Sequence, residues 1–170
     1  RNKTFFDNEI VAHVSMAHPT SKGLMNACEE AIKKEKIEYQ RNGTYVVMEG
    51  PQFSTLAESN LYRSWKADVI GMTNMPEAKL AREAEIRYAS VSMVTDFDCW
   101  HKEHDAVSVE MIIGNLTANA TATGPILFAL MEKLGRERPS SPAHHALKDA
   151  LMTAPDAVPA ATRQRLDLFT

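Results

Sequence analysis

The sequence contains only two cysteines among its 170 residues, and their placement excludes several classes of protein. Cys28 and Cys99 lie far apart and belong to no spacing that is typical of a metal centre or a redox pair. A disulfide-stabilised secreted fold is therefore not expected. We expect both side chains to be reduced thiols in a cytoplasmic protein.

Long apolar runs and basic clusters are also lacking. No stretch approaches the ~20 apolar residues of a membrane span, so no membrane partner is expected. The net charge is -3 and no basic run is longer than Lys33-Lys34, so no nucleic-acid partner is expected either. GxGxxG and Walker motifs are absent, which leaves nicotinamide and nucleoside-triphosphate chemistry without support. Small polar or anionic molecules remain as ligands.

Apolar β-branched runs alternate with helical patterns along the first part of the sequence. Strands are predicted at 10–15, 44–48, 69–72 and 88–94. Helices are predicted after Pro19, over 56–65 with Ser54 or Thr55 as the cap, and from Pro76 onward. This β-α-β-α-β order predicts an α/β fold, a mostly parallel sheet covered by helices.

The pattern changes after residue 135. Helices are predicted at 108–118 and 125–134, and Gly135 ends the second of them. Four prolines between positions 139 and 159 then divide the remaining sequence into short pieces. We therefore predict one α/β domain over 1–135 and a Pro/Ala-rich helical tail over 136–170.

Three polar loops each follow a predicted strand. They are Glu49 to Thr55, Met72 to Asn74 and Thr95 to Asp98. Because the carboxyl ends of parallel strands face the same edge of a sheet, these loops are expected to converge on one ligand site.

The same loops carry a specific resemblance to a known family. The matching runs are Glu49-Gly50-Pro51-Gln52-Phe53-Ser54-Thr55, Ala57-Glu58-Ser59, Ala67-Asp68-Val69-Ile70-Gly71-Met72-Thr73-Asn74-Met75-Pro76-Glu77 and Thr95-Asp96-Phe97-Asp98-Cys99-Trp100. They resemble the C-terminal part of the 5'-methylthioadenosine phosphorylase family, within the purine nucleoside phosphorylase superfamily. The likeness runs from about Lys3 to Ala118, whereas residues 140–170 resemble nothing in the family that we can place.

This resemblance implies a mixed sheet flanked by helices and an assembly of complete protomers into a homotrimer. It also implies an N-terminal half of the same protein, present as a separate chain or a missing segment and needed for full activity. That half supplies a Gly-rich phosphate loop and an Arg-His pair in the family. Inorganic phosphate is the co-substrate there, and no cofactor is implied.

Asp96 and Asp98 are the carboxylates expected to meet the purine. A 6-aminopurine offers N6–H donors and an N7 acceptor, so one carboxylate can accept from N6 while a protonated one donates to N7. Asp96 is the predicted general acid, which requires its pKa to rise from about 3.9. Burial near Phe53, Phe97 and Met72 and the charge of Asp98 would raise it. The alternative is that this Thr-Asp-x-Asp motif only caps a turn.

Ser54 and Thr73 resemble the phosphate contacts of the family. Ser54 at a helix start also places backbone N–H groups toward an anion, although a plain N-cap is an equally good interpretation. Neither loop contains a cation, and Gln52 stands where some members have arginine. Most positive charge on the phosphate is therefore expected from the N-terminal half.

Apolar residues are expected around the base and sugar. By resemblance, Phe53 and Phe97 lie near the base and Met72 lies under the ribose, whereas apolarity alone favours a core position. The helical stripe Val109, Ile112 and Ile113 resembles the pocket for the 5'-methylthio group, its alternative being ordinary packing. His13 resembles a histidine that reaches this pocket from a neighbouring subunit, or it is a plain interface histidine.

No metal is expected. The run His101-Lys102-Glu103-His104 lacks the i, i+4 histidine pair of a zincin helix. The predicted function is phosphorolysis of 5'-methylthioadenosine to adenine and 5-methylthioribose 1-phosphate. The alternatives are a phosphorylase for 6-oxopurine nucleosides or methylthioinosine, and a non-catalytic half-module that only binds purine.

Overall fold

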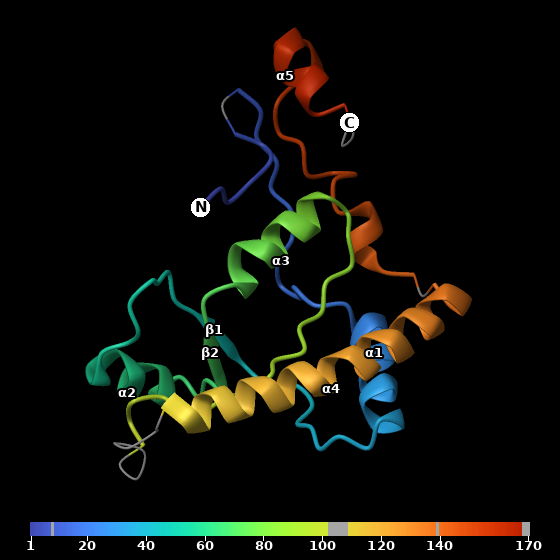
Figure 1. The fold of residues 1–170 in the computed structure, drawn as a ribbon. Coiled ribbons are helices and arrows are strands. Elements are labelled where there is room, and N and C mark those ends of the chain that lie inside the picture. Colours follow the sequence, from blue (N-terminus) through green and yellow to red (C-terminus); the bar gives the residue numbers. More distant parts are fainter. Residues whose placement is uncertain (8, 102–108, 139, 168–170) are drawn as a thin grey trace. The chain divides into compact units, whose positions relative to one another are not determined.

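The computed structural model describes residues 1–7, 9–101, 109–138 and 140–167 (Figure 1). Its helices are α1 (Lys22–Lys34), α2 (Leu56–Ser64), α3 (Asn74–Glu83), α4 (Val109–Arg136) and α5 (Ala160–Arg165). Its strands are β1 (Tyr45–Val47) and β2 (Val69–Gly71), and two short 3-10 turns are η2 (Pro142–His145) and η3 (Pro155–Ala157). None of the helices among these residues is long and apolar enough to span a bilayer.

The chain divides into two compact units. The first contains residues 1–25, 74–90 and 139–170, and the second contains residues 26–73 and 91–138. The four boundaries fall within α1, between β2 and α3, ahead of the loop that carries Asp96, and after α4. Each unit has its own small core.

The second unit holds the parallel sheet and the long helix α4. Strands β1 and β2 pair in parallel, with Tyr45 opposite Val69 and Val47 opposite Gly71. A separate apolar cluster joins α1 to α4 through Ala31, Ile32, Ile126 and Ala129. Lys133 of α4 adds an ion pair of 2.7 Å to Glu30 of α1.

The first unit ties the beginning of the chain to its end. Its core contains Phe6, Ile10, Leu147, Ala150 and Leu166. Ala12 forms an isolated antiparallel bridge with Leu151, in which His13 N–H donates to the Ala150 carbonyl at 2.8 Å. Residues of the 140–167 segment thus pack against the N-terminal segment of their own unit.

Two of the predicted strands are not formed. Residues 10–15 make only the bridge at Ala12, because their neighbour is the irregular segment around Leu151 rather than a strand. Residues 88–94 form no ladder, since carbonyl groups of this stretch are used elsewhere. The Tyr88 carbonyl accepts from Ser21 N–H, and the Val94 carbonyl accepts from the Asn119 side chain.

The predicted helix break before Pro125 is also wrong. α4 runs unbroken from Val109 to Arg136 with Pro125 inside it. A proline removes one backbone donor, and packing of Ile126 and Ala129 against α1 keeps the helix together across that point. The prediction that Pro76 begins a helix is confirmed, because Met75 still has extended backbone angles.

Candidate functional site

The edge where β1 and β2 end brings two of the predicted loops together. The strands are parallel neighbours, so both chains leave at the same edge, where Met48 N–H donates to the Gly71 carbonyl at 2.9 Å. Gly50 has a φ of +68°, and a Cβ added there would lie 2.6 Å from the Met72 sulfur. The positive φ favours glycine in this turn, and a larger residue would also displace the Met72 side chain. The predicted convergence of these two loops is confirmed.

The start of α2 is fixed by Thr55, which leaves Ser54 outside the cap. Thr55 Oγ1 accepts from Glu58 N–H at 3.2 Å, and Thr55 N–H donates to Glu58 Oε2 at 2.8 Å. These two bonds form a capping box. The pKa of Glu58 is lowered by the Thr55 N–H bond, which has the larger effect, and by the Thr55 hydroxyl, which donates to the same Glu58 Oε2 at 2.8 Å. The N-cap interpretation of Ser54 is therefore wrong.

Ser54 and Thr73 follow β1 and β2 at this edge. Ser54 is half-buried and its hydroxyl donates to the Met48 sulfur at 3.4 Å. Thr73 is exposed directly after β2. Their contact with phosphate stays a prediction.

The two aspartates of the third loop have different surroundings. Asp98 is half-buried and accepts from Cys99 N–H at 2.8 Å, which is the local turn contact considered as the alternative. Asp96 is exposed and accepts from the Thr95 hydroxyl at 2.7 Å. The described residues do not provide the burial that we predicted around Asp96, so its carboxylate is accessible to a ligand.

Two asparagines of α4 hold the backbone that leads to Asp96. Asn115 Nδ2 donates to the Thr95 carbonyl at 2.6 Å, and Asn119 Nδ2 donates to the Val94 carbonyl at 3.1 Å. Sequence reasoning missed both residues. The available signal was their i, i+4 spacing inside a helical pattern, where asparagine is a poor helix former and needs another reason to occur.

The third loop also reaches the first one. The Cys99 thiol donates to the Ser54 carbonyl at 3.6 Å. Through this contact the loop with Asp96 and Asp98 lies next to the loop with Ser54, and Met72 lies against Gly50 in that same loop. Residues from all three predicted loops are thus neighbours within the second unit.

The apolar residues predicted to line the site are mostly outside the core. Phe53 is 85% exposed, which rules out a core position, and Phe97 and Ile113 are also exposed. Phe97 stacks on the His101 ring with 4.6 Å between centroids. The side chains of Val109 and Ile112 lie outside what the structure describes.

His13 is exposed and belongs to the first unit, where its backbone is bound to Ala150. The predicted roles of all these residues toward substrate stay predictions. The histidine run 101–104 extends beyond the described residues after His101. Within the described part of the chain, no group of three potential metal ligands occurs.

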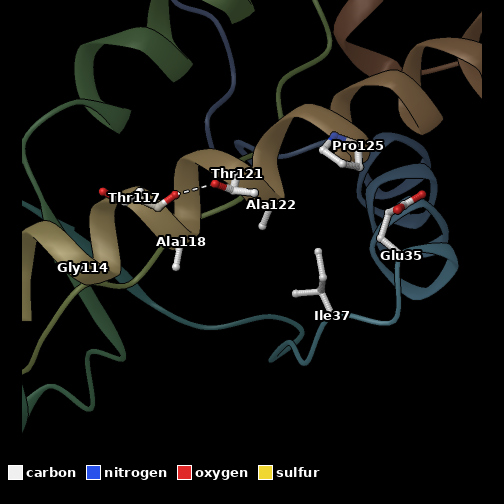
Figure 2. A pocket seen from close by; sticks show the side chains of 8 residues that line it. All are labelled: Glu35, Ile37, Gly114, Thr117, Ala118, Thr121, Ala122 and Pro125. Atoms are coloured by element: carbon white, nitrogen blue, oxygen red, sulfur yellow. Dashed lines mark hydrogen bonds between the residues drawn. The ribbon is translucent and has the colours of Figure 1, made fainter.

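A cavity of about 750 Å³ lies elsewhere in the second unit, along the side of α4 (Figure 2). Small residues of α4 line one side of it, and Glu35 and Ile37 from the segment after α1 line the other. The Thr121 hydroxyl on this face is used within the helix, donating to the Thr117 carbonyl at 2.9 Å. No predicted site residue lines this cavity, so it is separate from the candidate site.

Comparison with known proteins identifies the family. Residues 1–132, more than half of the chain, match the phosphorylase superfamily. The chain belongs to this superfamily. The S-methyl-5'-thioadenosine phosphorylase of Thermosynechococcus vestitus is 53% identical over 172 residues, which cover 99% of the chain and 60% of that protein. The enzyme of the same name from Rhodospirillum rubrum is 55% identical over 159 residues, covering 92% of the chain and 54% of that protein.

Solved structures agree with this superfamily assignment. A methylthioadenosine phosphorylase from an antarctic soil metagenomic library has a TM-score of 0.93 and 46% identity, over 100% of this chain and 60% of that one. The Schistosoma mansoni methylthioadenosine phosphorylase in complex with adenine has a TM-score of 0.79 and 27% identity, over 89% of this chain and 62% of that one. The predicted α/β phosphorylase fold is confirmed.

The comparisons confirm the family resemblance and correct one part of it. The T. vestitus relative aligns with 99% of the chain, so residues 140–170 do have counterparts, contrary to our expectation. The prolines of this segment obscure the regular patterns that sequence reasoning relies on. The chain spans 54 to 60% of the length of the two relatives named above. The boundary predicted at residue 135 stays a prediction.

Proposed function

We propose that this chain is part of an enzyme that cleaves 5'-methylthioadenosine with inorganic phosphate. The observation that carries the proposal is the contact between the loop of Asp96 and the loop of Ser54, made by Cys99 at 3.6 Å. A nucleoside phosphorylase must hold a base and a phosphate on either side of one sugar. Two adjacent loops, one acidic and one rich in hydroxyl groups, suit that arrangement.

In the proposed reaction, phosphate attacks C1' as the bond from C1' to N9 breaks. Electron density moves into the adenine ring, and Asp96 donates a proton to N7 to stabilise the leaving base. Asp98 accepts from the N6 amino group. The products are adenine and 5-methylthioribose 1-phosphate.

The remaining residues position the reactants. Ser54 and Thr73 bind phosphate, and the N-terminal end of α2 favours an anion beside Ser54. Met72 lies under the ribose, while Phe53 and Phe97 contact the base. Ile113 belongs to the proposed methylthio pocket, with Val109 and Ile112 as its further members. His13 is proposed to close this pocket from a neighbouring subunit.

The part of the relatives that this chain does not cover is proposed to complete the site. The candidate loops contain no arginine or lysine between residues 49 and 55, so another segment must neutralise the phosphate. We propose a homotrimer of complete protomers that uses no cofactor.

The test is adenine release measured by chromatography. The purified chain is mixed with 5'-methylthioadenosine and phosphate, alone and with the complementary segment of the T. vestitus relative. Adenine is expected only when both parts and phosphate are present. No release with both parts and phosphate would contradict the proposal and favour a passive purine-binding module. Release without phosphate would indicate hydrolysis instead.

A further inference from the structure

Helix α2 connects the two halves of the candidate site. Its first turn is fixed by the capping box of Thr55 and Glu58, so the adjacent Ser54 is tied to the helix start. Its last turn carries Arg63. Arg63 lies eight positions after Thr55, which corresponds to about 12 Å along a helix.

Arg63 contacts the loop that carries the aspartates. Its guanidinium carbon lies 3.9 Å from the centroid of the Trp100 ring, close enough for a strong cation–π contact. Trp100 in turn meets the edge of Phe97, with 6.0 Å between ring centroids. Within the described part of the chain, the Arg63 guanidinium makes its cation–π contact with the Trp100 ring.

The segment that follows Asp98 is therefore joined to Ser54 and to α2 at two points, one near each end of α2. At the N-terminal end of α2, the Cys99 thiol donates to the Ser54 carbonyl. At the C-terminal end, Arg63 covers Trp100, the residue after Cys99. A shift of α2 on phosphate binding must move the loop of Asp96, unless one of these contacts breaks.

We propose that Arg63 and Trp100 form a clamp that couples phosphate binding at Ser54 to purine binding at Asp96. This inference rests on the proposed function. Arg63 is a positioning residue, because the length of α2 keeps its guanidinium away from an anion at the helix start. A rigid element with a contact at each end transmits the state of one loop to the other. By linkage, phosphate then raises the affinity for adenine, and adenine raises the affinity for phosphate by the same factor.

The test measures the dissociation constant of adenine by calorimetry, with and without saturating phosphate, in the active form that contains both parts of the protein. The ratio of the two constants is the coupling factor. Arg63→Ala is expected to reduce this ratio by about fivefold, the size of one cation–π contact. The affinity for adenine without phosphate is expected to stay the same. Arg63→Lys keeps the charge but loses the flat stacking surface, so it should restore the ratio only in part.

Three comparisons keep the test decisive. Lys79→Ala, which removes an exposed positive charge from α3, should leave the ratio unchanged. Trp100→Leu should reproduce the loss, and the double variant should add nothing further. A wild-type ratio of one, or equal ratios in wild type and Arg63→Ala, overturns the clamp. Failure of the wild-type protein to cleave 5'-methylthioadenosine would instead overturn the proposed function.

Discussion

At the residue scale, Asp96 is expected to decide which purine is accepted. In the proposed site Asp96 donates to N7 beside Asp98, which pairs the 6-amino group of adenine. Asn at position 96 would instead present an amide N–H donor that suits the 6-oxo group of hypoxanthine. A site built to pair a substrate N–H can discriminate by ~10⁴ when that group is missing. Asp96→Asn should therefore shift kcat/KM from methylthioadenosine toward methylthioinosine.

The control for this prediction is Asp149→Asn, which changes an exposed carboxylate of the other unit. This variant should leave unchanged the ratio of kcat/KM for methylthioadenosine to kcat/KM for methylthioinosine. The same ratio in wild type and Asp96→Asn would contradict the assignment of Asp96 to the base.

The two cysteines are expected to differ in reactivity. Cys28 is 8% exposed, and desolvation by burial raises the pKa of its thiol, so little thiolate forms near neutral pH. Cys99 is exposed. A chromogenic disulfide reagent at pH 7.5 should modify Cys99 first and Cys28 only after unfolding. Two equally fast phases in the folded protein would contradict this.

The candidate site could be predicted only in part from the sequence. The loops that follow β1 and β2 were predictable, since glycine, proline and hydroxyl residues directly follow β-branched runs. Thr55 as the cap of α2 was also predictable, because Glu58 follows it three residues later in the pattern of a capping box. The support from Asn115 and Asn119 was not predicted, because nothing local indicates which backbone a helix side chain will reach.

At the element scale, the capping box of α2 gives a pH dependence. Bonds from Thr55 lower the pKa of Glu58 from its ordinary value of 4.5, so the folded state favours the charged form. The stabilisation is present above pH 4.5 and is lost as the pH falls through the lowered folded pKa. An NMR titration should place the midpoint of Glu58 below 4.5, and Thr55→Ala should raise it. A midpoint unaffected by Thr55→Ala would count against the box.

The packing of α4 on α1 gives a second prediction at this scale. Ile126 is 4% exposed in the shared cluster, while its neighbour Leu127 is 50% exposed. Ile126→Ala should lower the free energy of unfolding by about 2–4 kcal/mol, since it removes a buried side chain. Leu127→Ala is the matched control, and its effect should stay within about 0.5 kcal/mol. Urea denaturation measures both. Equal losses of unfolding free energy in the two variants would mean that the cluster does not stabilise the packing of α4 on α1.

The helices and strands that were predicted correctly have strong local signals. β1, β2 and α2 are bounded by turn residues or caps, and β1 and β2 are each other's partners across the single helix α2. The failed strands at 10–15 and 88–94 have β-branched residues but depend on a partner elsewhere in the chain. The unbroken α4 depends likewise on packing against α1, which outweighs the proline signal.

At the scale of the whole molecule, α4 carries more apolar surface than its own unit covers. Its exposed large side chains include Met111, Ile113, Leu116, Leu127, Phe128 and Met131. Surfaces of this kind are typical of interfaces. The isolated chain should therefore bind the dye ANS at neutral pH under native conditions. The complementary segment of the T. vestitus relative should reduce this fluorescence. An unchanged signal would contradict the prediction that this segment covers the apolar face of α4.

The bridge between Ala12 and Leu151 has a practical consequence. A proline-rich terminus is the kind of sequence that an engineer trims to improve crystals or expression. Here the backbone on both sides of that bridge is anchored by the terminus, through Met152 N–H to Val11 and His13 N–H to Ala150. Removing this segment would release the backbone of His13, the residue that we propose for the methylthio pocket, and is therefore expected to weaken binding of 5'-methylthioadenosine if the proposed function holds.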